Sequence, residues 1–355
     1  MSEFKINDNI TLKLEDQETV IYFNGEKFIQ CKGILLNRTI NELNSVLIKN
    51  SIDELMDEFD VELDMEIVSP ETEFLVHCSN LQVWSENGYN TELLHSNLAF
   101  PLLQKLSEVG DVLASQKFKE EIMRRLGSGA ENTVKYLVEE KYINYLDRDQ
   151  FWLSALEPEE AEAIIKLEEK FDHHFIIDFD MDYWEYEKLV LSFKNKRVIK
   201  LQIFGSQLSE IPEEIRWLKS IRILYLCENE FKKIPDWICN LRQLEVLDVS
   251  CCELEYITEE IGCLVSLKKL ELSWNHIEKI PESIGKLENL EICKIGYNVI
   301  EYLPESMGEL TNLRELYLNS NSLKNIPQTL YHLKKLKKLE LIGNNLRIET
   351  KMKLS

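Results

Sequence analysis

From Val198 onward, apolar residues recur with a fixed period of 23 residues. In the unit that begins at Leu267, Leu270 and Leu272 alternate with polar residues, which predicts a short strand with one buried side. Ile277 follows outside the alternation and predicts a buried turn. Six full units and one truncated unit keep this phase without insertion. The units begin at Val198, Ile221, Leu244, Leu267, Leu290, Leu313 and Leu336.

A polar column accompanies the apolar one at the ninth position of the units. Its side-chain amides can bond backbone groups of neighbouring turns that would otherwise be buried and unpaired. Pro281 then opens a short outer segment whose inner side is apolar. One unit cannot bury its apolar side alone, so neighbouring units are predicted to stack into a curved solenoid with the strands on the concave side. The column consists of Ser206, Asn229, Cys252, Asn275, Asn298, Asn321 and Asn344.

The unit matches L-x-x-L-x-L-x-x-N/C-x-L and therefore resembles a leucine-rich repeat. The 23-residue form with I-P-x-x-I-x-x-L resembles the intracellular repeat scaffolds that bind Ras-type GTPases and phosphatases. This resemblance extends from Val198 to about Ile348 and implies an α/β fold and a protein partner. It is carried by Ile211-Pro212, Ile234-Pro235, Ile280-Pro281, Leu303-Pro304 and Ile326-Pro327.

Three residues depart from the repeat pattern. Ser206 and Cys252 replace the ninth-position Asn, and Thr258 replaces the Pro of the outer segment. Two of the three fall in the third unit. We therefore expect the third unit to be held more loosely than its neighbours.

Ahead of the repeats, the pattern changes from strands to helices. Residues 9–31 predict a small β-meander in which Asn24-Gly25 is a type I′ turn signal. Ser51-x-x-Glu54 is a capping box that starts an amphipathic helix. From about Ser69 the apolar spacing is helical and places Phe74, Cys78 and Leu81 on one face.

A second resemblance covers about residues 9–150. The stretches HCSNLQVW (77–84) and NLAFPLLQKLSEVGD (97–111) are similar to an uncharacterised segment that precedes leucine-rich repeats in archaeal proteins. That segment implies no biochemical function, but it implies an archaeal cytoplasm. We expect four parts: a β-meander plus helix (1–68), a helical array (69–156), a cap for the solenoid (157–197) and the repeats (198–355).

The formal net charge of −22 is unevenly distributed. The repeats contain 21 basic and 23 acidic residues, so nearly all of the negative charge lies before Val198. Such an acidic surface repels nucleic acid and anionic membranes. We expect neither as a partner, and the acidic half is either a solvated surface or a contact for a basic protein.

Eight cysteines are scattered without a C-x-x-C spacing. The N-terminus has no pattern of a secretory signal, and no apolar run is long enough to cross a membrane. These features predict a cytoplasmic protein with reduced thiols.

Three motifs could carry chemistry, and each has a simpler explanation. His77-Cys78, with Glu92 and His95, contains the residue types of a thiol nucleophile or metal site. His77 and Cys78 nevertheless share a predicted helix face with apolar residues, which favours packing. The stretch GSGAENTVK (127–135) lacks the G-x-x-x-x-G-K-[ST] spacing of a phosphate loop and is better explained as a turn between helices.

The third motif is Asp172-His173-His174 with the run Asp178, Asp180 and Asp182. This run lacks the Gly and Glu of a calcium loop, because Tyr183 and Leu189 occupy those positions. We leave open whether it binds an ion. We predict no catalytic, cofactor-binding or metal-binding residue in the chain.

Large aromatic residues on the predicted concave side are the strongest functional signal. Tyr and Trp on a solvent-facing sheet have no core to fill and are typical interface anchors, although they can also pack along the sheet. We predict a non-enzymatic scaffold that binds a protein here, with a small GTPase or phosphatase as the class implied by the resemblance. The predicted binding residues are Phe204, Tyr225, Asp248, Glu271, Trp274, Lys294, Tyr297, Tyr317 and Asn319; Cys227 and Cys251 share the same side.

The alternative is an enzyme or ligand-binding domain in the N-terminal half, with the repeats selecting its substrate. A third possibility is self-association through the repeat ends. The first alternative requires turnover that depends on His77 or Cys78, and the second requires a mass in solution larger than that of one chain.

Overall fold

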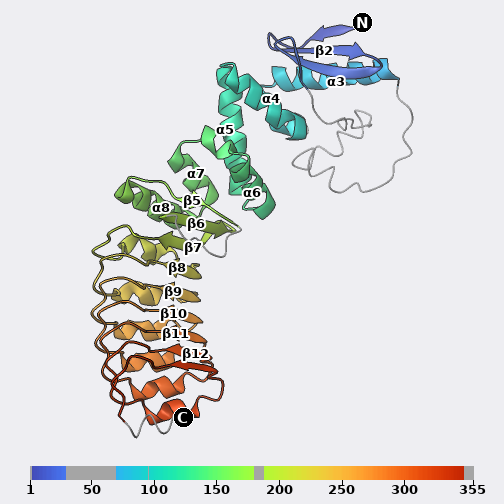
Figure 1. Ribbon diagram of the computed structural model, residues 1–355. Helices are drawn as coiled ribbons and strands as arrows, with labels where there is room; N and C mark the ends of the chain where they lie inside the picture. The colour runs from blue at the N-terminus through green and yellow to red at the C-terminus, as the bar shows by residue number, and fades with distance from the viewer. Residues whose placement is uncertain (1, 29–68, 95, 180–187, 348–355) are drawn as a thin grey trace. The chain divides into compact units, whose positions relative to one another are not determined.

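The computed structural model describes residues 2–28, 69–94, 96–179 and 188–347 (Figure 1). The chain divides into two compact units, Met1–Arg124 (unit 1) and Arg125–Ser355 (unit 2). The predicted helix after Ser51 lies outside the described residues, as do His95, Asp180 and Asp182.

Unit 1 begins with an antiparallel sheet in the order β1-β2-β3-β4. Asp16-Gln17 and Asn24-Gly25 form its two tight turns, and all four residues have positive φ, as a type I′ turn requires. The predicted meander with its Asn24-Gly25 turn is thus confirmed. The strands are β1 (Glu3–Lys5), β2 (Ile10–Glu15), β3 (Glu18–Phe23) and β4 (Glu26–Phe28).

One long helix, α3 (Pro70–Glu86), packs on this sheet through β2 and β3. Its N-cap is Ser69, whose hydroxyl accepts a hydrogen bond from the Thr72 N–H. The buried side of α3 includes Phe74, Cys78 and Leu81, as the helical spacing predicted.

The remainder of unit 1 is helical. It comprises η1 (Thr91–Leu93), α4 (Ser96–Glu108) and α5 (Val112–Gly127), the last of which continues into unit 2. Asp111 caps α5 by accepting from the Ala114 N–H at 2.9 Å. Its second carboxylate oxygen accepts from the Tyr89 hydroxyl at 2.7 Å, which ties the loop after α3 to the start of α5.

Unit 2 opens with α6 (Glu131–Glu139), η2 (Tyr142–Tyr145), α7 (Arg148–Ala155) and α8 (Pro158–Phe171). The buried carboxylate of Glu168 joins α7 to α8. It accepts from the Arg148 guanidinium at 2.8 Å, from Trp152 Nε1 at 3.0 Å and from the Phe175 N–H at 2.8 Å. His174 Nδ1 lies 3.1 Å from the same carboxylate, so this histidine of the candidate ion motif is within hydrogen-bond distance of Glu168.

The first repeat strand is β7 (Arg197–Ile203), and β6 (Leu189–Lys194) pairs with it in antiparallel fashion at the first end of the repeats. The short β5 (Ile176–Ile177) pairs with β6 in parallel. The Glu160 side chain, fully buried on α8, accepts from the Val198 N–H at 2.7 Å and from Arg197 at 3.2 Å. This carboxylate attaches α8 to the first repeat strand.

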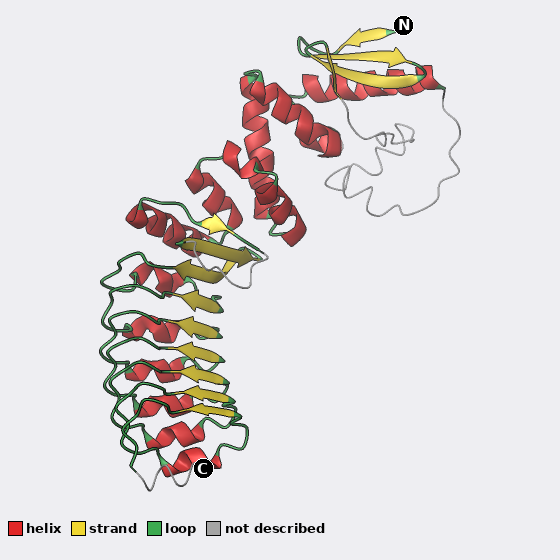
Figure 2. Cartoon of the chain, in the orientation of Figure 1, coloured by secondary structure: helices red, strands yellow, loops and turns green. Residues whose placement is uncertain are grey.

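The repeats alternate short parallel strands with outer 3-10 segments (Figure 2). Among the described residues, nine strands form one sheet in the order β13 to β5. The strands are β8 (Ile223–Tyr225), β9 (Val246–Asp248), β10 (Lys269–Glu271), β11 (Ile292–Lys294), β12 (Glu315–Tyr317) and β13 (Lys338–Glu340). The outer segments are η3 (Glu213–Trp217), η4 (Asp236–Asn240), η5 (Glu259–Cys263), η6 (Glu282–Lys286), η7 (Glu305–Glu309) and η8 (Gln328–His332).

Leu and Ile fill the space between the strands and the outer segments. Leu270, Leu272 and Ile277 are fully buried, as the period predicts. The ninth-position asparagines are also buried or nearly so, and each bonds across to the preceding unit. Asn298, for example, donates to the Leu272 carbonyl at 3.0 Å and accepts from the Ile277 N–H at 3.0 Å. The predicted role of this column is confirmed.

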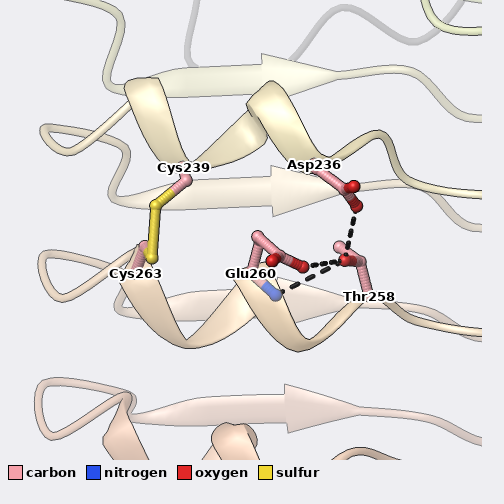
Figure 3. The surroundings of a disulfide bond; sticks show 5 residues. All are labelled: Asp236, Cys239, Thr258, Glu260 and Cys263. Carbon is pink, nitrogen blue, oxygen red and sulfur yellow. Dashed lines mark hydrogen bonds between the residues drawn. A yellow bond between two sulfur atoms is a disulfide. The ribbon is translucent and has the colours of Figure 1, made fainter.

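On the outer side of the third unit, the expectation of looseness is wrong. Cys239 of η4 and Cys263 of η5 form a disulfide between neighbouring outer segments (Figure 3). Thr258, in place of Pro, caps η5 by accepting from the Glu260 N–H, and its hydroxyl lies 2.8 Å from Asp236 Oδ1 in the second unit. For this cysteine pair, the prediction of reduced thiols is likewise wrong.

The outer segments approach closely because glycine occupies one position in three successive units. A Cβ on Gly262 would lie 2.6 Å from the Ser283 carbonyl, and one on Gly285 would lie 2.7 Å from the Ser306 carbonyl. Gly308 is as tightly placed against Thr329. In the second unit the same position holds Cys239, which uses its side chain to bond the next segment.

Candidate functional site

The candidate surface is the outward side of β7–β13, hereafter the strand face. The third, fifth, seventh and eighth positions of the units supply its side chains. The eighth position lies in the turn after each strand, three residues beyond the end of β10 in the case of Trp274, and has positive φ in every unit, from 52° at Cys251 to 77° at Gly343. This column of left-handed residues consists of Gly205, Glu228, Cys251, Trp274, Tyr297, Ser320 and Gly343.

Backbone hydrogen bonds hold the left-handed column in register. The eighth-position N–H of one unit donates to the seventh-position carbonyl of the next. Trp274 N donates to Gly296 O at 3.0 Å, and Tyr297 N donates to Asn319 O at 2.8 Å. Cys251 N likewise donates to Ser273 O at 2.9 Å. Side chains of the column therefore follow one another at about the spacing of neighbouring strands, ~4.8 Å.

Two aromatic rings of the column stack on each other. The ring centroids of Trp274 and Tyr297 are 3.8 Å apart, and their planes differ by 8°. Trp274 nevertheless remains 56% exposed and Tyr297 41% exposed. Because each ring covers one face of the other, the second face of Trp274 is directed away from Tyr297, along the column toward Cys251.

The C-terminal half of the strand face neutralises its own charges. Lys294 Nζ lies 3.1 Å from Glu271 and 5.5 Å from the centre of the Tyr317 ring. Lys338, from the next strand, lies over the same Tyr317 ring, 4.5 Å from its centre, and pairs with Glu340 at 3.0 Å. Lys294 and Lys338 are therefore both paired with carboxylates of the protein itself.

The N-terminal half has carboxylates of a different kind. Asp248 is hydrogen-bonded to the Ser250 hydroxyl at 2.6 Å and to the Ser250 N–H at 3.0 Å. Burial raises the pKa of Asp248 above its usual range, and these two bonds offset only part of that effect. Glu228 is exposed, and no ion pair of Glu228 or Asp248 with a cation occurs in the part of the chain that the structure describes.

The thiols of this half lie in a negative environment. Burial is the first cause of the raised pKa of Cys251, and the charges of Glu228, Asp248 and Glu271 add to it. Burial, followed by the charge of Asp248, raises the pKa of Cys227 to about 12. These thiols are therefore held in the neutral form and are poor nucleophiles.

Among the nine predicted binding residues, Trp274 and Tyr297 are the two with exposed side chains. Glu271 is 8% exposed, because Lys294 and neighbouring strands cover it. Three features of this face were not predicted from the sequence: the left-handed column, the contribution of Glu228 and the contacts of Lys338. The remaining predicted residues lie on the strand face and are partly buried: Phe204, Tyr225, Asp248, Lys294, Tyr317 and Asn319.

The other candidate motifs lie in packing contacts or turns. Cys78 is buried in the contact of α3 with its sheet, and burial raises the pKa of its thiol. Burial lowers the pKa of His77, which lies 3.5 Å from Glu73. Within the stretch 127–135, residues 128–130 form the predicted turn between α5 and α6, and the residues after them belong to α6. Across the described ranges, no three His, Cys, Asp or Glu side chains are arranged to hold a metal ion.

Comparison with known families identifies the repeats. Residues 244–353 match the model of a leucine-rich repeat region, and residues 220–241 match that of a single leucine-rich repeat. With the parallel sheet and outer 3-10 segments, this shows an α/β leucine-rich repeat solenoid, preceded by a small antiparallel sheet and helices. Such repeats are protein-interaction modules. In the described part of the chain, no helix is long and apolar enough to cross a bilayer.

Several solved structures are similar to part of the chain. A leucine-rich repeat protein of Leptospira interrogans is 31% identical over 44% of this chain and 46% of its own, with a TM-score of 0.37. The complex of PEPR1 with AtPEP1 gives 28% identity over 46% of this chain and 24% of the other, with a TM-score of 0.40. An internalin of Listeria monocytogenes is 22% identical over 39% of this chain and 40% of its own, with a TM-score of 0.34. The chain thus spans less than half the length of each, and no curated protein matches it.

Proposed function

We propose that this protein is a non-enzymatic scaffold that binds a folded protein on its strand face. The observation that carries the proposal is the stacked and exposed pair of Trp274 and Tyr297. Exposed aromatic rings that are held rigidly lose little side-chain entropy when a partner covers them. The predicted binding residues around the pair form the remainder of the proposed contact.

The backbone conformation at the pair supports this proposal. A left-handed conformation costs an L-residue roughly 1–2 kcal/mol, and glycine avoids that cost. Gly205 and Gly343 occupy the same column in the first and last units, so the fold accepts glycine there. Trp274 and Tyr297 adopt φ of 60° and 55° and remain 56% and 41% exposed. Strained residues of this kind are common where a ligand is bound.

The proposal includes a class of partner and a cellular compartment. The resemblance of the repeats to Ras-binding scaffolds makes a small GTPase, or a signalling phosphatase, the first class to test. A cytoplasmic setting follows from the same resemblance. The Cys239–Cys263 bond argues against an ordinary reducing cytosol, although intracellular proteins of hyperthermophilic archaea do contain disulfides. Thiol labelling of the protein in freshly quenched cells would measure its redox state.

The binding experiment compares four variants of the full chain. A panel of small GTPases and phosphatases from the source organism is first screened with the unaltered protein. Titration calorimetry then follows with Trp274→Ala, Tyr297→Ala, Glu282→Ala and Lys286→Ala. Truncation of an interface anchor costs about 2–4 kcal/mol, so each aromatic variant should bind at least about 30-fold more weakly.

The two other variants are matched controls, because Glu282 and Lys286 lie on the outer segment η6, away from the strand face. They should bind with unchanged affinity. Normal affinity in Trp274→Ala together with lost binding in the η6 variants would place the contact on the wrong side of the solenoid and refute the proposal.

A further inference from the structure

The free face of Trp274 lies next to an open position on the left-handed column. Tyr297 covers one face of the indole at 3.8 Å, whereas the neighbour on the other side is Cys251, a small and exposed side chain. Beyond Cys251 stands Glu228. Two strand spacings separate Glu228 from Trp274, which is about 10 Å along the column. A planar group stacked on the indole would fit between the two.

The charges around this position favour a cation. Glu228 lies beyond it and Asp248 beside it. Burial is the first cause of the raised pKa of the Cys251 thiol, and the negative charges of both carboxylates add to it. Neither forms an ion pair with a lysine, arginine or histidine among the described residues. Two cations of the repeats are engaged elsewhere, Lys294 with Glu271 at 3.1 Å and His276 with Glu253 at 3.0 Å. Lys269 acts on Asp248 through its charge without forming an ion pair with it.

We infer that this position, named here the Trp274–Glu228 slot, binds an arginine side chain of the partner protein. Arginine matches the slot better than lysine does. Its guanidinium is planar, so it can stack on an indole, and its N–H groups can bond a carboxylate at the same time. A cation within about 6 Å of the ring centre gains from the negative face of the indole. The inference rests on the proposed function, because it names the chemistry that the strand face recognises.

The two halves of the strand face thus differ in what they offer a partner. The C-terminal half, with Lys294, Tyr317 and Lys338, has balanced its charges internally. Among the described residues, the N-terminal half leaves Glu228 and one aromatic face without a paired cation, and Asp248 interacts with Lys269 through charge without an ion pair. A partner with a basic segment would therefore place that segment over the second to fourth units.

The test uses the full chain and three small peptides of equal length. The probe is Ac-Gly-Arg-Gly-NH2, and its controls carry citrulline or alanine in place of arginine. Citrulline has nearly the shape of arginine and keeps three of its five side-chain N–H groups, but it has no charge. Binding is followed by the NMR signal of the Trp274 indole N–H, which is identified as the signal lost in Trp274→Phe.

We expect a saturable shift with the arginine peptide, and affinity at least fivefold weaker for citrulline. Glu228→Gln should weaken arginine binding at least threefold. Glu288→Gln should not, because Glu288 is exposed on the opposite side of the repeats. Equal shifts for arginine and citrulline, no saturable shift, or undiminished binding in Glu228→Gln would each overturn the inference. None of these outcomes would refute protein binding, which is decided by Trp274→Ala and Tyr297→Ala against a whole partner.

Discussion

Asn275 and Asn298 donate side-chain hydrogen bonds to the same oxygen, the Leu272 carbonyl, each at 3.0 Å. One asparagine belongs to the same unit as Leu272, and the other to the next unit. The shared acceptor therefore joins the two turns through polar bonds, in addition to the packing of apolar side chains. The Ile295 carbonyl is shared in the same way by Asn298 and Asn321.

The first prediction follows from this shared bonding. Asn298→Ala leaves the Ile277 N–H without its acceptor and removes donors from the Leu272 and Ile295 carbonyls. The two carbonyls keep their second asparagine donors, so the Ile277 N–H is the group left unpaired. An unpaired buried group costs about 1–3 kcal/mol, and the free energy of unfolding should fall by at least that amount. Urea denaturation measures it. Glu288→Ala, on the exposed outer side, should change stability by no more than about 0.5 kcal/mol. Equal losses in the two variants would contradict the register of the repeats.

The second prediction concerns the gap in the asparagine column. The Cys252 thiol donates to the Leu226 and Ser250 carbonyls, both at 3.4 Å, but offers no oxygen to the Phe231 N–H. Asn275 provides such an oxygen to Leu254, one unit further on. Cys252→Asn should therefore raise the free energy of unfolding by about 0.5–1.5 kcal/mol. Cys293→Asn is the control, since Cys293 is fully buried in the strand core and the same change there should destabilise the protein. A loss of stability in Cys252→Asn would disprove the equivalence of the two positions.

The third prediction concerns the disulfide between η4 and η5. The two cysteines are separated by 24 residues, and closing a loop of that size stabilises a protein by about 3 kcal/mol. Dithiothreitol should accordingly lower the urea midpoint of the unaltered protein. Cys239→Ser should show the lower midpoint with or without reductant. If reductant has no effect on the unaltered protein, the bond does not contribute to its stability.

Much of this arrangement follows from the sequence, and the remainder depends on contacts between units. The period alone predicts the buried Leu270 and the bonding of Asn298, because both repeat in every unit. Cys239 and Cys263 are separated by one period plus one residue, so their proximity could have been found from the register. The partners of Glu271 could not, because whether Lys294 turns toward it or toward solvent depends on local packing. The left-handed conformation at Trp274 was also missed, although Gly205 and Gly343 in the same column were a signal for it.

The fourth prediction is a pH dependence that originates at Glu160. Burial raises the pKa of this carboxyl above its ordinary value of 4.5, more than its bonds to Val198 and Arg197 lower it. The folded state thus holds the proton more tightly than the unfolded state. Its contribution to stability is present below pH 4.5 and is lost as the pH rises through the folded-state pKa.

Glu160→Gln removes this titration while keeping an oxygen for the Val198 N–H. The stability of the variant relative to the unaltered protein should therefore be more favourable at pH 7 than at pH 4. Glu169→Gln, on the exposed side of the same helix, should show no such difference. Urea denaturation at both pH values measures this, and an opposite trend would mean that the bonds to Arg197 and Val198 outweigh burial.

The last prediction tests the backbone at Trp274 apart from any partner. In the left-handed conformation, glycine is unstrained and a β-branched residue is strongly disfavoured. Trp274→Gly loses the stacking with Tyr297, worth about 0.5–1.5 kcal/mol, but relieves strain of roughly the same size. Its stability should thus remain within about 1 kcal/mol of the unaltered protein. Trp274→Val loses the stacking without that relief and should be less stable than Trp274→Gly by at least about 1 kcal/mol.

The control for this comparison is Ile292, which lies in the extended strand β11. Valine suits a strand and glycine weakens it, so Ile292→Gly should be less stable than Ile292→Val. The order of the two residues is therefore expected to reverse between Trp274 and Ile292, as measured by urea denaturation. The same order at both positions would show that Trp274 is not held in a strained conformation. The proposed function would then depend on the exposure and stacking of the Trp274 and Tyr297 rings alone.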